Sequence, residues 1–377
     1  MRFLTGGESH GPCLMTIVEG LPAGLEIDVR AIDDELARRQ AGYGRGERMK
    51  IERDRAEILG GVLAGRTIGA PIVLQIANRD WENWREKWES GSLPRVTVPR
   101  PGHADWAGMQ KYGLADARPI LERASARETA ARVAVGALAK LLLREFGISV
   151  GSTICSIGSV EATIPDGPWN AIWARAEKSS VRCADEAAGV RMIEAIDSAR
   201  AAGESLGGLF CVAATGVPAG LGSHVHWDRR LDAQLACAVM SIQAVKGVEI
   251  GSGFAGAGRT GTQAHDSLTT DERGNVIRVT NRAGGVEGGM SNGEAIVLRA
   301  AMKPIPTTVT PQESIDTATG APAKTEYQRS DVCAVPAAAV VGEAMVAWVL
   351  AVALREKLGG DSLEEMKAHD DAWGSDG

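Results

Sequence analysis

Two long apolar stretches with helical spacing dominate the chain. The first, Arg118–Gly147, predicts one long helix with charged first turns and an apolar, buried body at Val133–Leu143. The second, Pro336–Leu358, predicts another helix and is interrupted by Glu343. Its uncharged runs are shorter than the roughly 20 residues that a membrane span needs. Both stretches therefore predict helices in the core of a soluble globular protein.

An internal repeat relates the two parts of the chain. With an offset of 196 residues, GESHGPCLMTIVEGLPAGL at Gly7–Leu25 aligns without gaps with GESLGGLFCVAATGVPAGL at Gly203–Leu221, and nine of the nineteen positions are identical. Each copy predicts an apolar strand, a Pro-Ala-Gly turn and a helix, at Val29–Ala41 and Asp228–Val245 respectively. This shared order favours a duplication, and it predicts a layered α+β fold with pseudo-symmetric halves.

The repeat also distinguishes residues that recur in both copies, and so are explained by the shared turn, from one residue that does not recur. Gly, Glu and Ser recur in both copies, but His10 is aligned with Leu206. Because an imidazole can give or take a proton near neutral pH, His10 is a candidate catalytic residue.

Domain organisation follows from the absence of any low-complexity linker. We expect a single domain of two fused pseudo-repeats over residues 1–359. Residues 360–377 contain six acidic residues and one lysine, and they are expected to form a disordered acidic tail.

The distribution of charge indicates which kinds of molecule the protein binds. A net charge of -7 argues against a nucleic-acid partner, whereas Arg38 to Arg55 gathers seven Lys/Arg against three Asp/Glu and suits a small anionic substrate.

Six scattered cysteines without a CxxC pair or a signal peptide indicate reduced thiols in a cytoplasmic protein. A GxGxxG match at Gly256–Gly261 lacks the helix and acidic residue of a dinucleotide site, and an HVH sequence lacks further metal ligands.

Several segments in the first half carry candidate chemistry. Arg39 and Arg45 belong to a Gly-rich basic stretch that is either a lid over an anion or a solvated loop. RPGHAD holds Arg100 and His103 on a turn that prolines stiffen, although a structural histidine remains an alternative. Three tryptophans in DWENWREKWES indicate packing or a subunit contact rather than ring stacking with a ligand.

The start of the first long helix is a candidate anion site. Arg123, Ser125 and Arg127 lie in its first turns, where unpaired N–H groups and the helix dipole favour an anion. Cations there are unfavourable unless an anion lies between them, and a salt-bridged surface turn is the alternative.

The second half adds two further segments. NRAGGVEGGMSNGEAIVLRAAMKPIPT combines glycines, which allow a flat ligand to approach the backbone, with Lys303 on a stiff extended segment. Arg329 and Asp331 are two residues apart before the last long helix, so they would face the same side of an extended chain.

Nine short motifs together resemble those of one enzyme family. They are GESHGP, RRQAGYGRGERMKIE, RPGHAD, ERASARETAAR, MSIQAVKGVEIG, GRTGTQAHD, GGMSNG, KPIPT and RSDVCAVP. On these motifs nearly the whole chain strongly resembles chorismate synthase. The resemblance implies a homotetramer with a β-α-β sandwich core and bound reduced FMN (FMNH2). It also implies a lyase that converts 5-enolpyruvylshikimate 3-phosphate to chorismate and phosphate by 1,4-elimination, the last shared step towards aromatic amino acids.

The resemblance also implies roles for matching residues. His10 would protonate the departing phosphate, His103 would protonate or stabilise the reduced flavin, and Asp331 would help to remove the ring proton. The implied substrate contacts are Ser9, Arg39, Arg45, Arg100, Ser125, Arg127 and Arg329. The implied FMN contacts are Arg123, Ala124, Ser125, Gln243, Ala244, Gly288, Lys303, Pro304, Ile305, Pro306, Thr307 and Arg329. The residues that match the family's NADP-binding positions are Arg39 and Arg45, and NADPH would be an external reductant of the flavin.

The chain departs from the family pattern in two places. It reads RSDVCAVP where many members have an RHDPC form, and it lacks the long insertions of the bifunctional fungal enzymes. We therefore expect a monofunctional enzyme that depends on an external flavin reductase. A flavin-independent transferase acting on a shikimate phosphate is the alternative, although it would not explain the Gly-rich segment at 281–307.

Overall fold

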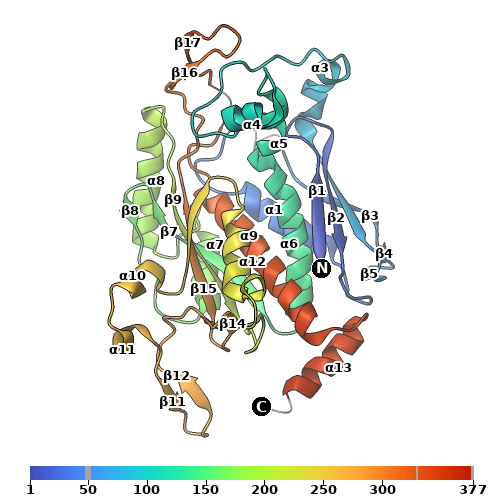
Figure 1. Cartoon of the computed structure of the whole chain (residues 1–377), viewed down its shortest axis with the longest axis vertical. Helices are drawn as coiled ribbons and strands as arrows, with labels where there is room; N and C mark the ends of the chain where they lie inside the picture. Colours follow the sequence, from blue (N-terminus) through green and yellow to red (C-terminus); the bar gives the residue numbers. More distant parts are fainter. Residues whose placement is uncertain (47–51, 328–329, 375–377) are drawn as a thin grey trace.

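The fold is a β-α-β sandwich, in which two antiparallel sheets enclose a layer of long helices (Figure 1). A computed structural model describes residues 1–46, 52–327 and 330–374 of the chain. The α+β layered architecture predicted from the sequence is confirmed, and the expected β-α-β order of layers is found.

The first sheet comes from the N-terminal repeat. Its strand order is β1-β2-β6-β3, and the strands are β1 (Arg2–Gly6), β2 (Cys13–Glu19), β6 (Ile72–Ala77) and β3 (Ala56–Gly60). Side chains alternate between the two faces of a strand, so Leu14 and Val18 of β2 point into the core while Ile17 is exposed.

The second sheet contains the other repeat. Its strand order is β10-β15-β9-β7-β8, and the strands are β10 (Val245–Ile250), β15 (Ile296–Met302), β9 (Gly208–Thr215), β7 (Ser149–Ile157) and β8 (Val160–Glu161). The two aligned sequence repeats therefore supply β2 and β9, an inner strand of each sheet.

Four helices form the middle layer. They are α1 (Val29–Gln40), α6 (Thr129–Arg144), α9 (Leu231–Met240) and α12 (Val335–Leu358). Helices α6 and α12 lie against each other along much of their length (Figure 1). They approach so closely that a Cβ added to Gly136 of α6 would lie 2.3 Å from the Cβ of Ala344.

Helix α12 is the one described helix that is long and apolar enough to cross a membrane. In the folded chain, however, 94% of its apolar window is buried inside the protein. Its length and composition are thus accounted for by its place between the two sheets.

Shorter elements surround this core. Helical ones are η1 (Arg79–Asn83), α3 (Arg85–Glu89), α4 (Asp105–Tyr112), α5 (Arg118–Ala124), η2 (Ala126–Glu128), α7 (Trp169–Lys178), α8 (Glu186–Ala201), η3 (Trp227–Arg229), α10 (Gly253–Ala257), α11 (Gly261–Ala264) and α13 (Leu363–Gly374). The paired strands are β4 (Val62–Leu63) with β5 (Arg66–Thr67), β11 (Leu268–Thr270) with β12 (Val276–Arg278), β13 (Val286–Glu287) with β14 (Met290–Ser291), and β16 (Glu313–Ile315) with β17 (Pro322–Lys324).

The structure corrects three expectations from the sequence. The helix predicted over Arg118–Gly147 is broken at Ser125 into α5, η2 and α6, because Ser125 is extended (φ -60°, ψ 141°). The second repeat helix is shorter than predicted. Part of the tail expected to be disordered forms α13, because Met366 is fully buried and Lys367 pairs with Glu145 at 2.6 Å.

Candidate functional site

The break at Ser125 turns a charged helix start into a buried cluster of polar side chains. The Ser125 hydroxyl accepts a hydrogen bond from the backbone N–H of Arg127 at 3.2 Å, so the chain changes direction before α6. Arg127 then points inward, where its Nη1 lies 2.7 Å from Asp54 Oδ1 and its Nε donates to Asn78 Oδ1 at 2.8 Å. Arg127 is only 4% exposed, so its charge depends on these partners.

Arg39 joins the same cluster from the last turn of α1. Its Nη1 lies 3.5 Å from Asp54 Oδ2, and its Nε donates to Thr129 Oγ1 at 2.9 Å. Burial lowers the pKa of Arg39 to about 10, with Asp54 opposing that shift and the nearby Arg127 adding to it. Glu52, also buried, lies 3.7 Å from Arg127 Nη2, so two buried arginines face two buried carboxylates in this cluster.

His10 lies beside this cluster, between a carboxylate and an aromatic ring. Its Nδ1 is 3.0 Å from Glu122 Oε1 and 3.1 Å from Glu122 Oε2, and its backbone N–H donates to Glu122 Oε2 at 2.9 Å. The centroid of the Trp84 ring lies 4.2 Å from that of the imidazole. Neighbouring Ser9 is buried, and its backbone N–H donates to the Glu122 carbonyl at 2.9 Å.

Arg123 and Ala124 end α5 on the same side. Arg123 Nη1 donates to the Gly7 carbonyl at 3.1 Å, and its Nη2 donates to the Thr5 carbonyl at 2.8 Å. Since these contacts tie α5 to the β1–β2 connection, they hold the turn that carries His10.

A second histidine–carboxylate pair is formed by His103 and Asp105. His103 Nδ1 lies 2.5 Å from Asp105 Oδ1, and Arg100 Nε donates to Asp105 Oδ2 at 2.8 Å. Burial alone would raise the pKa of Asp105, but hydrogen bonds from His103 and Arg100 outweigh it and hold that pKa well below its usual range. Arg100 and His103 therefore surround a fully buried carboxylate.

Residues of the second half complete the surroundings of Arg100. Its Nη1 donates to Thr307 Oγ1 at 3.2 Å, and Lys303 Nζ donates to the Gly102 carbonyl. The backbone N–H of Lys303 in turn donates to the Ala244 carbonyl at 3.0 Å. Pro304, Ile305 and Pro306 lie between these contacts. The segment 303–307 is therefore held between the RPGHAD turn and Ala244.

Gln243 and Ala244 have two unusual features. Ala244 adopts a left-handed backbone with φ 66°. The Gln243 side chain donates to Glu128 Oε2 at 3.2 Å, while its Oε1 is buried and has no hydrogen-bond partner among the described residues. A buried acceptor of this kind is suited to a ligand N–H or O–H.

The Gly-rich basic loop meets the segment before α12. Arg45 Nη1 lies 2.8 Å from Asp331 Oδ2, and the Gly46 N–H donates to Asp331 Oδ1 at 2.7 Å. Gly44 has a positive φ of 87°, and a Cβ added to it would lie 3.3 Å from the Cβ of Cys333. Arg329, the other residue proposed from the sequence here, lies outside the described residues.

Gly288 is the described candidate that the fold does not bring near the others. It lies between β13 and β14, in the lower half of Figure 1, whereas α4 and α5 lie in the upper half. This hairpin is beside the Ile296 end of β15, and Lys303 follows the other end. A strand of seven residues separates its ends by about 20 Å.

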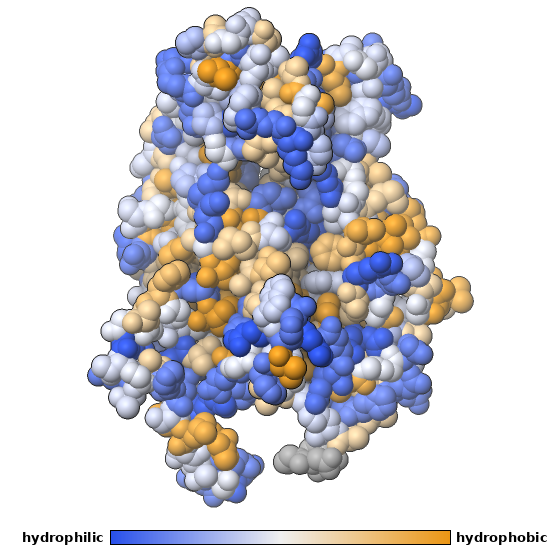
Figure 2. Space-filling model, viewed as in Figure 1, coloured by the Kyte–Doolittle hydropathy of each residue, from blue (hydrophilic) through white to orange (hydrophobic). Residues whose placement is uncertain are grey.

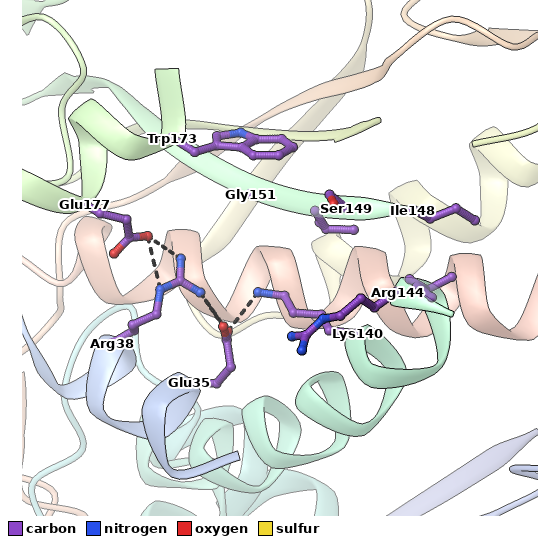
Figure 3. A pocket seen from close by; sticks show the side chains of 11 residues that line it. Glu35, Arg38, Lys140, Arg144, Ile148, Ser149, Gly151, Trp173 and Glu177 are labelled. Atoms are coloured by element: carbon purple, nitrogen blue, oxygen red, sulfur yellow. Dashed lines mark hydrogen bonds and ion pairs between the residues drawn. The ribbon is translucent and has the colours of Figure 1, made fainter. Parts of the chain in front are cut away.

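The surface is hollowed where most of the candidates gather. Figure 2 shows a hollow in the upper half of this face, bordered mainly by hydrophilic residues, just below the position of α4 in Figure 1. Figure 3 shows a different cavity of about 410 Å³, between α1, α6, β7 and α7. Four of its charged residues already pair with one another, Arg38 with Glu177 and Lys140 with Glu35, and none of its lining residues is a candidate from the sequence.

Sequence reasoning missed the partners of the candidate residues. Glu122, Asp54 and Asn78 are buried polar side chains, and Trp84 covers His10. The only signal for Glu122 was its place in the charged start of the predicted helix, since its contact with His10 spans 112 residues. The packing role expected for the tryptophans holds for Trp81 and Trp88, whose rings meet edge to face.

Comparisons with known proteins agree on one family. The family model described as chorismate synthase matches residues 1–354. A chorismate synthase of Moorella thermoacetica is 58% identical over 96% of this chain and 95% of its own length, and one of Desulforudis audaxviator is 56% identical over 97% and 95%. A crystal structure of chorismate synthase superposes with a TM-score of 0.81 at 46% identity, covering 99% of this chain and 96% of that one.

Chorismate synthases are carbon–oxygen lyases of the shikimate pathway that act on a phosphate ester, and the chain is an enzyme of this class. The match extends over almost the whole length of both partners in each comparison. The chain belongs to the chorismate synthase family.

Proposed function

We propose that this chain converts 5-enolpyruvylshikimate 3-phosphate to chorismate and phosphate by 1,4-elimination, with reduced FMN bound. One observation supports the proposal beyond family membership. Arg39 and Arg127 are buried in one cluster with the carboxylates of Asp54 and Glu52, and Asn78 connects Arg127 to the turn that carries His10. Buried arginines beside a histidine suit a substrate that carries a phosphate and two carboxylates.

Residues of both halves fit a flavin phosphate and ring system. Lys303 and Arg123 are cations at the edge of the cluster, and Gln243 has a buried acceptor without a partner in the described part of the chain. Hydrogen bonds link Ser125 to Glu128, which Gln243 contacts, and Ala244 to Lys303, while Thr307 accepts one from Arg100. Ser125, Ala244 and Thr307 would complete the flavin contacts. Reduced FMN, when bound there, supplies an electron transiently to the reaction and takes it back.

The chain's own side chains would do the rest of the work. Arg39 and Arg127 would bind substrate anions and stabilise the charge that develops on the leaving phosphate. His10 would give a proton to the phosphate oxygen as the carbon–oxygen bond breaks. Asp331, held by Arg45 and the Gly46 N–H, would orient towards the ring proton, and His103 would hold a proton near the flavin site.

A homotetramer would explain two features that a single chain leaves open. The outer face of the first sheet exposes Leu4 at 69%, Ile17 at 45% and Leu59 at 50%, which suits a subunit contact. Gly288 lies too far from Lys303 to reach the same flavin within one chain, so its flavin contact would come from a neighbouring copy. We further propose a cytoplasmic enzyme whose flavin is reduced by a separate reductase, with NADPH as the source of electrons.

Anaerobic turnover tests this proposal. The purified chain is incubated with 5-enolpyruvylshikimate 3-phosphate and chemically reduced FMN, and chorismate and phosphate are both quantified. Equal amounts of the two products are expected, with none when oxidised FMN replaces the reduced form under anaerobic conditions. The absence of both products would refute the proposed reaction, whereas turnover without flavin would support a flavin-independent transferase.

The role of His10 has a separate test. His10→Ala should lower kcat by roughly 100-fold or more, because proton transfer by a positioned side chain contributes about that factor. FMN binding, measured by titration, should be nearly unchanged. Exposed His226→Ala is the matched control and should turn over normally. Normal turnover by His10→Ala would remove it from the reaction.

A further inference from the structure

His10 is held by one residue from three directions. The Glu122 carboxylate faces its Nδ1 with both oxygens, at 3.0 and 3.1 Å, and also accepts its backbone N–H. The Glu122 carbonyl accepts the N–H of Ser9 at 2.9 Å. The turn that carries the histidine and the imidazole itself are therefore both fixed by a single residue of α5, through its side chain and its carbonyl.

Glu122 is itself held in place. Its side chain is 4% exposed, and Arg118, one turn earlier on α5, lies 3.4 Å from its Oε1. The Arg118 guanidinium also lies 5.6 Å from the centroid of the Trp84 ring, which contacts His10 as well. Burial would raise the pKa of Glu122, but hydrogen bonds from His10 outweigh it and the pKa is lowered. The carboxylate is thus ionised and rigid.

An ionised carboxylate accepts hydrogen bonds and cannot donate them. The Nδ1 atom of His10 must therefore carry the hydrogen, and in the neutral ring the lone pair is on Nε2. Among the described residues Nε2 has no hydrogen-bond partner, and 17% of the side chain is exposed. The reactive nitrogen is consequently Nε2, on the side of the ring away from Glu122.

We propose that Glu122 is a positioning residue that fixes His10 as the Nδ1–H tautomer and makes Nε2 the atom that exchanges a proton with the substrate. This inference rests on the proposed function. In the proton transfer, the Nε2–H bond of the imidazolium breaks and an O–H bond forms on the departing phosphate. The electron pair stays on Nε2, Nδ1 keeps its hydrogen, and Glu122 remains a carboxylate that stabilises the imidazolium before the transfer.

Nitrogen NMR on the free protein tests the tautomer without any turnover. The chain is labelled with ¹⁵N-histidine, and the His10 signals are assigned by their loss in His10→Asn. Wild-type protein should show the neutral ring as Nδ1–H. Glu122→Met removes the acceptor and should shift the ring to the Nε2–H form that histidine favours in water. An Nε2–H ring in the wild type would overturn the proposal, even if no variant folds.

Kinetics test the consequence for the reaction. Glu122→Met should lower kcat by about 10- to 100-fold with KM little changed, and Glu122→Gln, which keeps an acceptor oxygen, should lose less. In a His10→Asn background, Glu122→Met should lower kcat no further, because its effect passes through His10. Equal losses of kcat in the wild-type and His10→Asn backgrounds would show that Glu122 acts on the fold, and they would refute the inference.

Two controls separate this result from other failures. Glu145→Gln changes an exposed ion pair with Lys367 and should alter neither the tautomer nor kcat. If the wild-type protein forms no chorismate, the proposed function fails while the NMR result still decides the role of Glu122. Rescue of kcat by Glu122→Asp would further support a charge that acts through the ring.

Discussion

Glu343 is a buried charge in the most apolar helix, and removing that charge should cost much of the stability of the protein. Its carboxylate is 0% exposed and accepts hydrogen bonds from Arg38 at 2.8 Å, Lys140 at 2.6 Å, Arg182 at 2.9 Å and Ser152 at 2.6 Å. These partners come from α1, α6, the loop before α8, and β7. One carboxylate thus joins the helical layer to the second sheet.

The magnitude follows from what remains after Glu343→Gln. Three cations, 23%, 14% and 7% exposed in the side chain, would then be shared by Glu35 and Glu177 alone. Breaking a buried ion pair by removing one partner costs about 3–5 kcal/mol. The amide keeps the shape of the side chain and can still accept from Ser152, so we expect a loss near the lower figure.

Denaturation in guanidinium chloride at one fixed protein concentration measures this loss. The matched control is Glu177→Gln, because Glu177 contacts Arg38 and Arg182 but is 39% exposed, and pairs so exposed contribute about 0–1 kcal/mol. Glu343→Gln should therefore lower the free energy of unfolding several times more than Glu177→Gln. Equal losses, or a Glu343→Gln loss below about 0.5 kcal/mol, would refute the reasoning.

The same variant should show a characteristic pH dependence. Burial would raise the pKa of Glu343, but Lys140, Arg38 and Arg182 outweigh it and lower that pKa well below its usual value. A carboxyl whose pKa is lower in the folded state stabilises the protein fully above its unfolded pKa of about 4.3 and loses that effect as the pH falls. The difference between wild type and Glu343→Gln should therefore be constant from pH 8 to about pH 5 and shrink below about pH 4.3. A difference that grows on acidification would contradict this sign.

Two further predictions concern packing, and both are measured by the same denaturation assay. Gly136→Ala should cost about 1–3 kcal/mol although alanine favours helices, because its Cβ would overlap Ala344, whereas Gly261→Ala has no atom within 4 Å and should be neutral. Met366→Ala should cost about 2–5 kcal/mol if α13 is part of the core, while Ala368→Ser on its exposed face should change stability by less than about 0.5 kcal/mol. An unchanged midpoint for either core variant would contradict the packing described.

The layers of the fold follow from patterns that are local in sequence. The apolar runs in the two aligned repeats predicted β2 and β9, and helical spacing predicted the apolar bodies of α6 and α12. The break at Ser125 could not be predicted in this way, since serine within an alanine-rich stretch is compatible with both a helix interior and a cap. What decides between them is the burial of Arg127 against Asp54, a contact across 73 residues.

The candidate site could be predicted in part for the same reason. His10 could be identified because the second repeat has leucine at the aligned position, and the arginines because many of them lie close together in the sequence. Glu122 did not, because only the folded chain brings its carboxylate to Nδ1. In the tail, the acidic residues concealed the helical spacing of Leu363, Met366 and Trp373, all of which pack on the core.

The position of α12 near the end of the chain has a consequence for synthesis on the ribosome. Both sheets are complete once residue 302 has been made, yet the helix that packs most extensively on the second sheet ends at Leu358. Until that segment emerges, the apolar face of the second sheet lacks its main helical cover, and nascent chains with such exposed surface aggregate readily. The segment that closes the core is therefore translated after both sheets, and chains truncated before Val335 should depend on chaperones to remain in solution.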